Sequence, residues 1–296
     1  MDRVLVIVVT YNAMRWIDRC LGSLLASKPK PDVFVVDNAS TDGTPDYLSS
    51  NFNDVIVNKP GRNLGFGQAN NIGLKYALEN GYSYVYLMNQ DAWVFDNTIE
   101  GLVTLSKGYP EYGILSPFHL EAGQTRLDWR FQVNSCYSNN AIFNDFYSGS
   151  PAEVYPVRCV AAAHWLIPVS TLRIVGGFSP SFYHYGEDDN YADRVRWFGM
   201  KIGVAPGLKA IHDRGDREYS KNREMRISAM CVIRELSKPG VKIATPLLHA
   251  FKALCVSDVR RFHSFKPVKW FFHILSHFGG IVANKKTSEK EGESFL

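Results

Sequence analysis

Cysteine is scarce in this sequence, and the cysteines present are not spaced for cross-linking. Five of them are scattered over 296 residues, and no two form a CxxC pair. Disulfide frameworks and structural zinc sites both depend on paired or closely spaced cysteines. The sequence therefore predicts neither, and a reducing compartment such as the cytoplasm suits it.

Long apolar stretches and a strong charge of one sign are also missing. The run VLVIVV at residues 4–9 is too short for the core of a signal peptide, and no later run reaches the roughly 18 residues of a spanning helix. We therefore expect a cytoplasmic protein that meets a membrane only from its surface. The 33 basic and 29 acidic residues give a formal charge of +4, which is too small to predict a nucleic-acid partner.

Two nucleotide-binding signatures are incomplete. Gly65 and Gly67 begin a dinucleotide-binding GxGxxG pattern, but Asn70 stands at its third glycine, and the segment follows the third apolar run where the fingerprint follows the first. A GxxxxGK[ST] phosphate-binding loop is absent from the sequence. An oxidoreductase and a P-loop ATPase are therefore not favoured, and the glycines indicate a close approach of the backbone to a ligand or a strand.

Short apolar runs rich in β-branched residues predict a parallel sheet. They lack the alternation of half-exposed strands, as expected for strands buried on both faces. Segments of helical periodicity separate them, so we expect an α/β fold with a doubly wound, mostly parallel, Rossmann-like central sheet. The strands are predicted at residues 4–9, 33–36, 55–57 and 84–88.

Polar residues follow each of these runs. Ligands of such sheets bind outside the carboxyl ends of the strands, so polar strand ends at one edge predict a cleft for a polar ligand, although each residue alone also suits a turn. Asp91 is the most demanding, because an ionised carboxylate where a buried strand emerges is costly unless something positive meets it. The strand-end residues are Thr10, Tyr11 and Asn12, then Asp37 and Asn38, then 61–71, then Asn89, Gln90 and Asp91.

The second half carries further candidates for chemistry. Residues 157–168 predict a strand with His164 and Trp165, whereas residues 120–156 show no clear pattern. Asp188 lies in the first turn of a predicted helix, after the aromatic stretch SFYHYG, which would shield its carboxylate and make it a candidate general base. His212 ends another apolar run, and with Asp91 it could supply nitrogen and oxygen ligands to a divalent cation, although a single histidine is more often structural.

Seven motifs follow one another along the sequence. They are VVTYN (8–12), VDNASTDGT (36–44), NLGFGQANNIG (63–73), LMNQDA (87–92), GGF (176–178), YGEDDNYADRVRWFG (185–199) and IHDRG (211–215). In this order they resemble the motifs of family 2 inverting glycosyltransferases with the GT-A fold, especially the bacterial rhamnosyltransferase-like branch. They cover roughly residues 3–215, so the resemblance implies a GT-A catalytic domain over most of the chain.

The resemblance implies a role for each matching residue. Asp188 matches the catalytic base, Asp91 the last acid of the metal-binding DxD motif, and His212 a histidine that completes the metal site in some members. The implied cofactor is Mg²⁺ or Mn²⁺, and Asn89 replaces the first acid of the motif, which implies weak metal binding before the donor arrives. The implied donor-binding residues are Thr10, Tyr11, Asn12, Asp37, Asn38, Arg62, Asn63, Asn70, Gln90 and Asp91, and the acceptor-binding ones are His164, Trp165 and Glu187.

The implied function is inverting transfer of a sugar from a nucleoside-diphosphate donor to a hydroxyl of a glycan or lipid-linked glycan in bacterial surface polysaccharide synthesis. Two alternatives stay open. A nucleotidyltransferase would share the fold but should carry a basic glycine-rich loop after the first strand, where this chain has TYNAMRW. A non-catalytic sugar-binding module could use Trp129, Trp165 and Tyr183 but would not need Asp91 and Asp188. The sequence names neither the donor sugar nor the acceptor.

The C-terminal region differs in composition from the rest. Its basic residues far outnumber its acids and alternate with aromatic ones, which leaves two interpretations: helices that pack on the catalytic domain, or peripheral contact with the inner face of a membrane through Trp270, Phe271 and Phe272. The expected domains are 1–220 for catalysis (1–119 for the donor, 120–220 for the acceptor), 221–286 for a basic, aromatic, helical appendage and 287–296 for a flexible tail.

Overall fold

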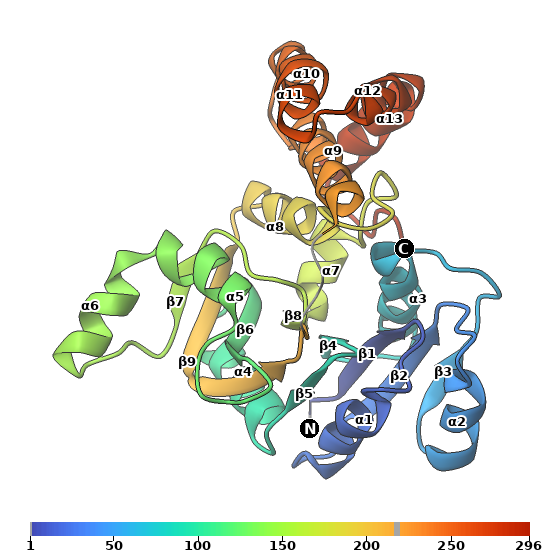
Figure 1. Cartoon of the computed structure of the whole chain (residues 1–296). Helices are drawn as coiled ribbons and strands as arrows, with labels where there is room; N and C mark the ends of the chain where they lie inside the picture. Colours follow the sequence, from blue (N-terminus) through green and yellow to red (C-terminus); the bar gives the residue numbers. More distant parts are fainter. Residues whose placement is uncertain (1, 216–219) are drawn as a thin grey trace.

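The computed structural model describes residues 2–215 and 220–296 (Figure 1). Within these residues one mixed sheet contains the strands β1 (Val4–Thr10), β2 (Asp32–Asp37), β3 (Ile56–Asn58), β4 (Tyr84–Asn89), β5 (Ala92–Val94), β6 (Tyr112–Leu120), β7 (Tyr155–Val157), β8 (His164–Pro168) and β9 (Lys201–His212). The helices of the first 200 residues are α1 (Ile17–Ala26), α2 (Thr44–Asn51), α3 (Phe66–Glu79), α4 (Thr98–Gly108), α5 (Trp129–Asn134), η1 (Cys136–Ser138), α6 (Asn140–Ser148), α7 (Val169–Val175) and α8 (Glu187–Trp197).

The four predicted strands form a continuous parallel block of the sheet, in the order β3-β2-β1-β4. In this register Thr10 at the end of β1 pairs with Asp37, and Val9 pairs with Asn89. The carboxyl ends of β1, β2 and β4 are therefore level with one another. The prediction that their polar residues meet at one edge is confirmed.

Both faces of this sheet are covered, which explains the missing alternation in the strand sequences. Leu5 and Ile7 of β1 face a core that includes residues of α3, and Val6 and Val8 face a second core that includes residues of α1. All four side chains are fully buried. A strand packed on both sides gains from apolar residues at every position, so a continuous apolar run is the favoured sequence.

The second half extends the sheet with mixed pairing. The strand β8 runs antiparallel to β4, and β6 lies between β8 and β9. The single strand expected over residues 157–168 is in fact two, β7 and β8, because β7 pairs with β9 instead. The stretch without a clear pattern contains α5, η1 and α6, and α6 lies at the outer edge of the molecule (Figure 1).

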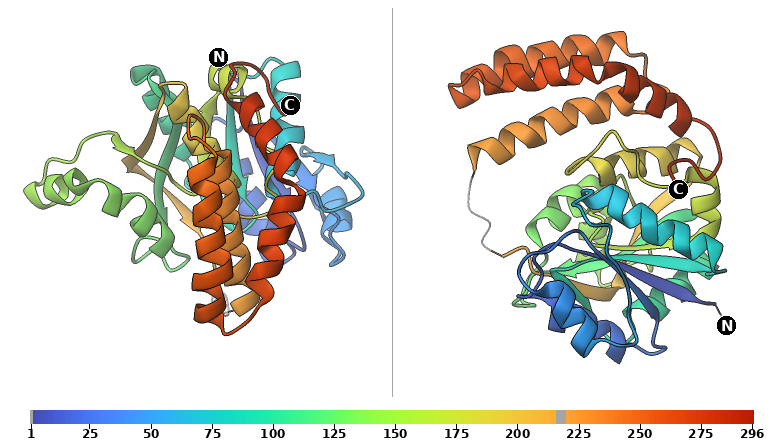
Figure 2. Two further views of the ribbon diagram at one scale, coloured as in Figure 1. Left: turned by 90° about the horizontal axis from the view of Figure 1, so that it is seen from above. Right: turned by 90° about the vertical axis from the view of Figure 1, so that its right-hand side faces the viewer.

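The helical appendage predicted from the composition is present. It packs on the sheet domain through Phe182, which joins a small apolar core with Ile233, Leu254 and Ile274, and Figure 2 shows its helices in layers above that domain. All described helices are too short or too polar to cross a membrane. The appendage helices are α9 (Lys221–Ser237), α10 (Ala244–Phe251), the π-helical η2 (Lys252–Ser257), α11 (Asp258–Phe262), α12 (Lys266–Ser276) and α13 (Phe278–Ser288).

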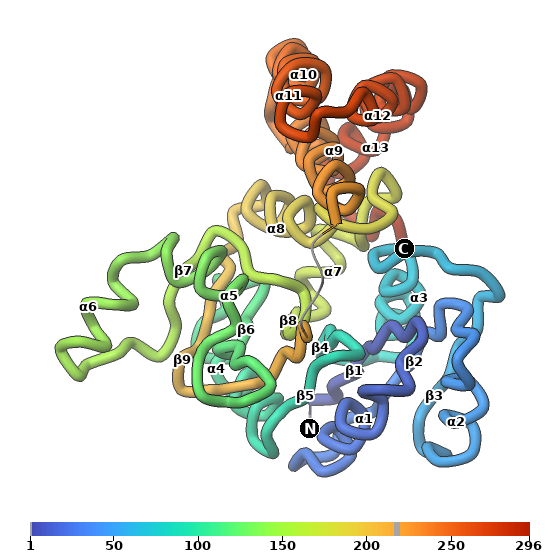
Figure 3. Tube along the Cα trace, viewed as in Figure 1, coloured from blue at the N-terminus to red at the C-terminus, as the bar shows by residue number. Residues whose placement is uncertain are grey.

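The expectation of a flexible tail over residues 287–296 is wrong. The backbone oxygen of Ser294 accepts a hydrogen bond of 2.8 Å from the Gly177 N–H, and that of Phe295 accepts one of 3.1 Å from the Asn71 side chain. The end of the chain lies beside α3 (Figure 3), with Leu296 packed against the main core. The apolar Phe-Leu pair after a polar stretch therefore anchors this segment.

Candidate active site

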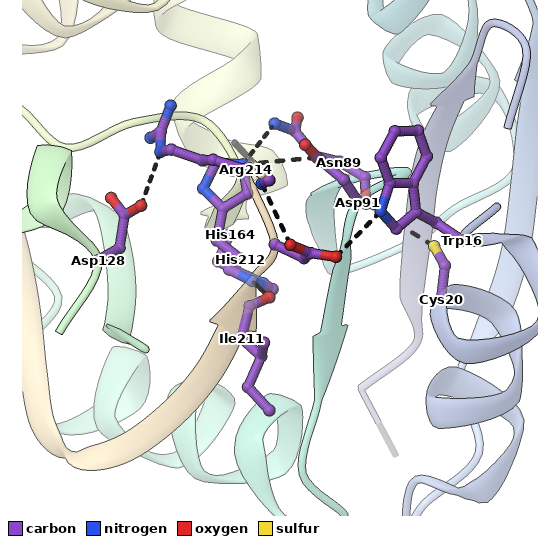
Figure 4. Close-up of polar contacts among 11 residues, drawn as sticks. Trp16, Cys20, Asn89, Asp91, Asp128, His164, Ile211, His212 and Arg214 are labelled. Atoms are coloured by element: carbon purple, nitrogen blue, oxygen red, sulfur yellow. Dashed lines mark hydrogen bonds and ion pairs between the residues drawn. The ribbon is translucent and has the colours of Figure 1, made fainter. Parts of the chain in front are cut away.

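The pairing of β5 with β9 explains how Asp91 is held at the end of a buried strand. Residues 90 and 91 form the turn between β4 and β5, and Ala92 lies opposite His212 in the antiparallel register of β5 and β9. The Asp91 Oδ1 is 3.5 Å from the His212 Nε2, with side chains that are only 7% and 1% exposed (Figure 4). A strand far along the chain therefore brings an imidazole to the buried carboxylate.

A set of buried polar contacts fixes this pair in place. The Asp213 N–H donates to the Asp91 backbone oxygen at 2.7 Å, and the Trp16 indole donates to the Asp213 carboxylate at 3.1 Å. His164 lies 3.0 Å from the Ile211 oxygen through Nε2 and 2.8 Å from the Tyr86 hydroxyl through Nδ1. Because a carbonyl only accepts, Nε2 carries the proton.

His164 is therefore a support for the end of β9. It has no exposed surface, and burial lowers the pKa of its imidazole to about 3, so the ring is neutral. His119 is a second buried histidine, whose ring lies 5.0 Å from that of His164, and burial holds its pKa well below the usual range. The expectation that His164 contacts an acceptor is therefore corrected: it is a buried structural residue.

The pair of Asp91 and His212 fits a divalent cation that shares its remaining ligands with a bound diphosphate. Mg²⁺ and Mn²⁺ take oxygen and imidazole ligands, and neighbouring ligands of an octahedral ion lie about 3 Å apart. The 3.5 Å between Oδ1 and Nε2 is close to that separation. Across residues 2–215 and 220–296, no group of three or more Asp, Glu, His or Cys side chains could hold a metal by itself. Weak metal binding before the donor arrives stays a prediction.

A cavity of about 570 Å³ opens beside Asp91, outside the carboxyl ends of β1, β2 and β4. Five of the predicted donor residues line it, namely Tyr11, Asn38, Asn63, Gln90 and Asp91. Lining residues outside the predicted donor set include Trp16, Phe66, Tyr183, His184 and Arg226. The sequence signal for Tyr183 and His184 was the aromatic stretch before Asp188, whereas no motif pointed to Arg226, which comes from α9.

Hydrogen bonds of two amide side chains order the walls of the cavity beside Asp91. The Asn38 side chain accepts from the Leu64 N–H at 2.8 Å and donates to the Gly65 oxygen at 3.1 Å. Gln90 likewise accepts from the Tyr11 N–H at 2.7 Å and donates to its oxygen at 3.2 Å. Gly65 has a φ of +78°, and a Cβ atom there would overlap the Tyr183 backbone oxygen. The glycine therefore lets the loop after β3 approach the segment before α8.

The other predicted donor residues do not line the cavity. Asp37 is buried, and its carboxylate accepts hydrogen bonds from the Thr10 hydroxyl at 2.9 Å, the Ser40 hydroxyl at 2.6 Å and the Ser40 N–H at 3.0 Å. These contacts order the turn after β2. The other three also lie outside the cavity. Arg62 is exposed, the Asn12 side chain accepts a hydrogen bond of 2.8 Å from the Thr41 N–H, and the Asn70 side chain donates one of 3.0 Å to the Phe66 oxygen.

Asp188 lines a separate, smaller cavity of about 160 Å³ at the start of α8. It is partly buried, and its Oδ1 accepts from the Asp189 N–H at 2.9 Å. Burial, with the nearby Asp189 carboxylate, raises the pKa of Asp188 to about 6. Glu187 lines the same cavity, and burial together with the charge of Asp188 raises its pKa to about 8. At neutral pH Asp188 is therefore ionised but more basic than an exposed carboxylate.

A third cavity is lined by His212 and adjoins the cavity of Asp188. It has a volume of about 640 Å³, and its walls include His212, Trp129, Arg214 and Arg223. Arg214 and Arg223 also line the cavity of Asp188, so the two cavities share walls. The Arg214 Nε donates to Asp128 at 2.8 Å, which fixes its guanidinium. His212 of the candidate metal pair and the candidate base Asp188 thus line adjoining cavities.

Trp165 does not belong to this site. Its side chain has no exposed surface, its indole N–H donates to the Val160 oxygen at 3.1 Å, and its ring packs against Tyr191 at 5.8 Å between centroids. The expectation that Trp165 contacts an acceptor is therefore corrected: it is a core residue. Trp129, by contrast, is 67% exposed on the wall of the third cavity.

A doubly wound sheet with an acid and a histidine at its carboxyl edge, and a carboxylate of raised pKa in a nearby cavity, is the arrangement that the resemblance to GT-A glycosyltransferases implies. Residues 5–161, slightly more than half of the chain, match the family described as Glycosyl transferase family 2, and the chain belongs to that family. It is therefore an enzyme that transfers sugars in glycan synthesis. The nucleotidyltransferase and the non-catalytic module left open by the sequence are not supported.

Individual relatives are distant. The chain is 25% identical over 229 residues to the N-acetylglucosaminyl-diphospho-decaprenol L-rhamnosyltransferase of Mycobacterium tuberculosis, an alignment that covers 70% of this chain and 75% of that protein. It is 38% identical over 92 residues to the undecaprenyl-phosphate mannosyltransferase of Micrococcus luteus, covering 30% and 38% of the two proteins.

Solved structures share the fold. The mannosyltransferase PcManGT from Pyrobaculum calidifontis, in complex with GDP-Man and Mn²⁺, superposes with a TM-score of 0.60 at 18% identity, covering 97% of this chain and 86% of that one. TarS residues 1–349 of S. aureus, in complex with UDP-GlcNAc, superpose with a TM-score of 0.57 at 14% identity over 97% and 90%. At these identities the likeness supports the fold alone.

Proposed function

We propose that this protein moves a sugar from a nucleoside-diphosphate donor to a hydroxyl of a glycan or lipid-linked glycan, with inversion at the anomeric carbon, in bacterial surface polysaccharide synthesis. The observation that carries the proposal is the position of Asp188. Its carboxyl is partly buried and more basic than usual, and its cavity adjoins the one lined by His212. An inverting transfer needs such a base on the acceptor side, opposite the leaving group.

The donor would bind in the cavity beside Asp91. Tyr11, Asn38 and Asn63 would contact the nucleoside from the ends of β1 and β2 and from the loop before α3. Asp91 and His212 would hold Mg²⁺ or Mn²⁺, which when bound neutralises the charge that builds on the leaving diphosphate. Arg226 of α9 faces the same cavity and would add a positive charge from the side of the appendage.

Asp188 would activate the acceptor. As the acceptor hydroxyl attacks the anomeric carbon, its proton passes to the Asp188 carboxylate, a step typically worth about 10²–10⁴-fold in rate. The bond to the leaving diphosphate breaks on the opposite face, so one displacement inverts the centre. A base with a pKa of about 6 is ionised at neutral pH yet takes up the proton more readily than an ordinary aspartate.

The names of the relatives support a lipid-linked acceptor. Two of them are named for polyprenyl acceptors, and the solved structures hold nucleotide sugars, one of them with Mn²⁺. A polyprenyl-linked sugar is presented at a membrane surface, because its lipid stays in the bilayer. We therefore place the reaction in the cytoplasm, at the inner face of the membrane.

A panel of nucleotide sugars tests the proposal. One nucleoside-diphosphate sugar should raise the melting temperature of the protein when Mg²⁺ or Mn²⁺ is present and do so much less with a chelator, because the metal would bridge donor and protein. With that donor, NMR of the first-formed product should show an inverted anomeric configuration. Stabilisation by no nucleotide sugar, or retention of configuration, would contradict the proposed mechanism.

A further inference from the structure

The outer surface of the C-terminal helices carries an unusual charge balance. Residues 238–288 contain nine lysines and arginines and a single acid, Asp258. Asp258 is only 6% exposed, so this segment presents no acidic side chain to solvent. Lys252 and Lys269 are both exposed on it. The surface therefore suits a negatively charged partner.

Large apolar side chains are exposed among these charges. Phe265 is 80% exposed and Phe272 is 63% exposed. Phe265 is the N-terminal cap of α12, and Lys269 and Phe272 follow it by four and seven residues, a spacing that places all three on one face of the helix. Leu248 and Phe251 of α10, exposed by 61% and 48%, add to this surface.

The two helices present one continuous surface. The ring of Phe251 lies 5.6 Å from that of Phe271, which lies 6.0 Å from that of Phe272. Of the three aromatic residues that the sequence suggested for membrane contact, only Phe272 is exposed, because Trp270 and Phe271 pack against the helical core. We call Leu248, Phe251, Lys252, Phe265, Lys269 and Phe272 the outer helical face.

The outer helical face ends close to the active site. At the turn between α11 and α12, Arg261 pairs with Glu224 at 2.9 Å and Lys266 donates to Asn222 at 3.2 Å, both at the start of α9. Farther along α9, Arg226 lines the donor cavity. Phe265, in the same turn, therefore projects near the helix that forms part of the cavity walls.

We propose that the outer helical face binds the surface of an anionic lipid bilayer. Phe265 and Phe272 insert at the level of the headgroups, and Lys252 and Lys269 meet lipid phosphates. Exposed aromatics beside lysines, with no exposed acid in the segment, match this partner better than they match another protein, because protein–protein interfaces are depleted of lysine. The inference rests on the proposed function for its purpose, since it would hold the active site beside a lipid-linked acceptor.

Sedimentation with vesicles tests this surface in the full-length chain. The parent should bind vesicles of phosphatidylcholine and phosphatidylglycerol, bind much less at high salt, and bind weakly to phosphatidylcholine alone. The double variant Phe265→Ala/Phe272→Ala should lose roughly tenfold or more in binding. Lys252→Glu/Lys269→Glu should lose more than about tenfold, because each basic residue near the surface is worth roughly fivefold.

A matched control comes from the other end of the molecule. Phe143 and Tyr147 of α6 are 51% and 96% exposed, and α6 lies far from the C-terminal helices (Figure 1). Phe143→Ala/Tyr147→Ala should bind vesicles as the parent does. Parental binding by both outer-face variants, equal loss in the control, or no binding by the parent would overturn the inference.

Donor hydrolysis without vesicles separates this inference from the proposed function. All three double variants should hydrolyse the nucleotide sugar at the parental rate, which also shows that they fold. If the parent hydrolyses the donor but binds no vesicles, only the membrane surface is wrong. If it binds vesicles through the outer helical face but acts on no nucleotide sugar, only the proposed function is wrong.

Discussion

Replacing Asp188 by Asn should remove catalysis and stabilise the fold at the same time. Asn is nearly isosteric, and its Oδ1 can still accept the 2.9 Å hydrogen bond from the Asp189 N–H. The substitution therefore removes the charge and the basicity with little change in contacts. Loss of the general base should lower the transfer rate by about 10²–10⁴-fold, while donor affinity stays nearly unchanged because the donor cavity is separate.

The gain in stability follows from the pKa of Asp188. A carboxyl with a pKa of about 6 in the fold and about 4 when unfolded binds more protons in the native state between these values, so the parent loses stability as the pH rises through that window. The difference between these two pKa values lowers the free energy of unfolding of the parent by at most about 3 kcal/mol above pH 6. Because the carboxyl faces a cavity, solvent offsets part of this, and we expect Asp188→Asn to raise the free energy of unfolding at pH 7 by about 1–2 kcal/mol.

Three measurements on the same variant check this reasoning. Denaturant unfolding from pH 4 to pH 8 should show a stability gain that is near zero at pH 4 and grows until about pH 6. Release of nucleoside diphosphate reports catalysis, and titration with the donor reports affinity. A variant that is less stable than the parent at pH 7, or that loses donor affinity together with rate, would refute the assignment and make Asp188 a structural residue.

Asp189 supplies the matched control. It is one residue away in the same helical turn and forms an ion pair of 3.7 Å with Arg234. Asp189→Asn should keep catalysis. Because the Asp189 charge helps to raise the pKa of Asp188, its removal should move the acid limb of the pH–rate profile, expected near pH 6 in the parent, to lower pH.

Three further substitutions probe the donor site. Asp91→Asn should remove the metal-dependent part of donor affinity and lower turnover on the order of 10²-fold, and parental turnover in the presence of a chelator would contradict this. Asp37→Ala should weaken nucleoside diphosphate binding about tenfold through the turn after β2 without changing which sugar is preferred, as competition between donors would show. Gly81→Ala should lower the free energy of unfolding in denaturant by about 1–2 kcal/mol, because its φ is positive. Gly65→Ala should lower it clearly more, since only a Cβ at position 65 meets backbone. Equal losses would mean that the loop shifts freely.

The strands and the donor edge could be predicted because their signals are local. Runs such as VLVIVV report burial on both faces, and the register of parallel strands then brings Asp37 and Asn89 to one edge. The sequence alone could suggest His212 as the partner of Asp91 only as a hypothesis, because an antiparallel pairing between segments about 120 positions apart brings the two together. No periodicity in either segment specifies that pairing.

The errors concern which way a side chain faces. Trp165 and Trp129 are chemically equal as sugar platforms, yet one lies in the core and the other lines a cavity. Which neighbours cover a side chain depends on the tertiary packing, and a single strand sequence does not encode it. The same holds for Trp270 and Phe272 on α12, and for the last residues of the chain, whose polar composition hides the anchoring role of Phe295 and Leu296.

The buried histidines behind β9 and the buried acids of α8 have opposite effects on acid tolerance. As the pH falls below about 6.5, His119 and His164 bind protons in the unfolded chain but stay neutral in the folded protein, so the fold loses stability. Over much of the same range Glu187 and Asp188 bind protons that the unfolded chain has released, and the fold gains. Below about pH 6 the two effects therefore oppose each other, so the buried acids of α8 offset part of the stability that the buried histidines lose in mild acid.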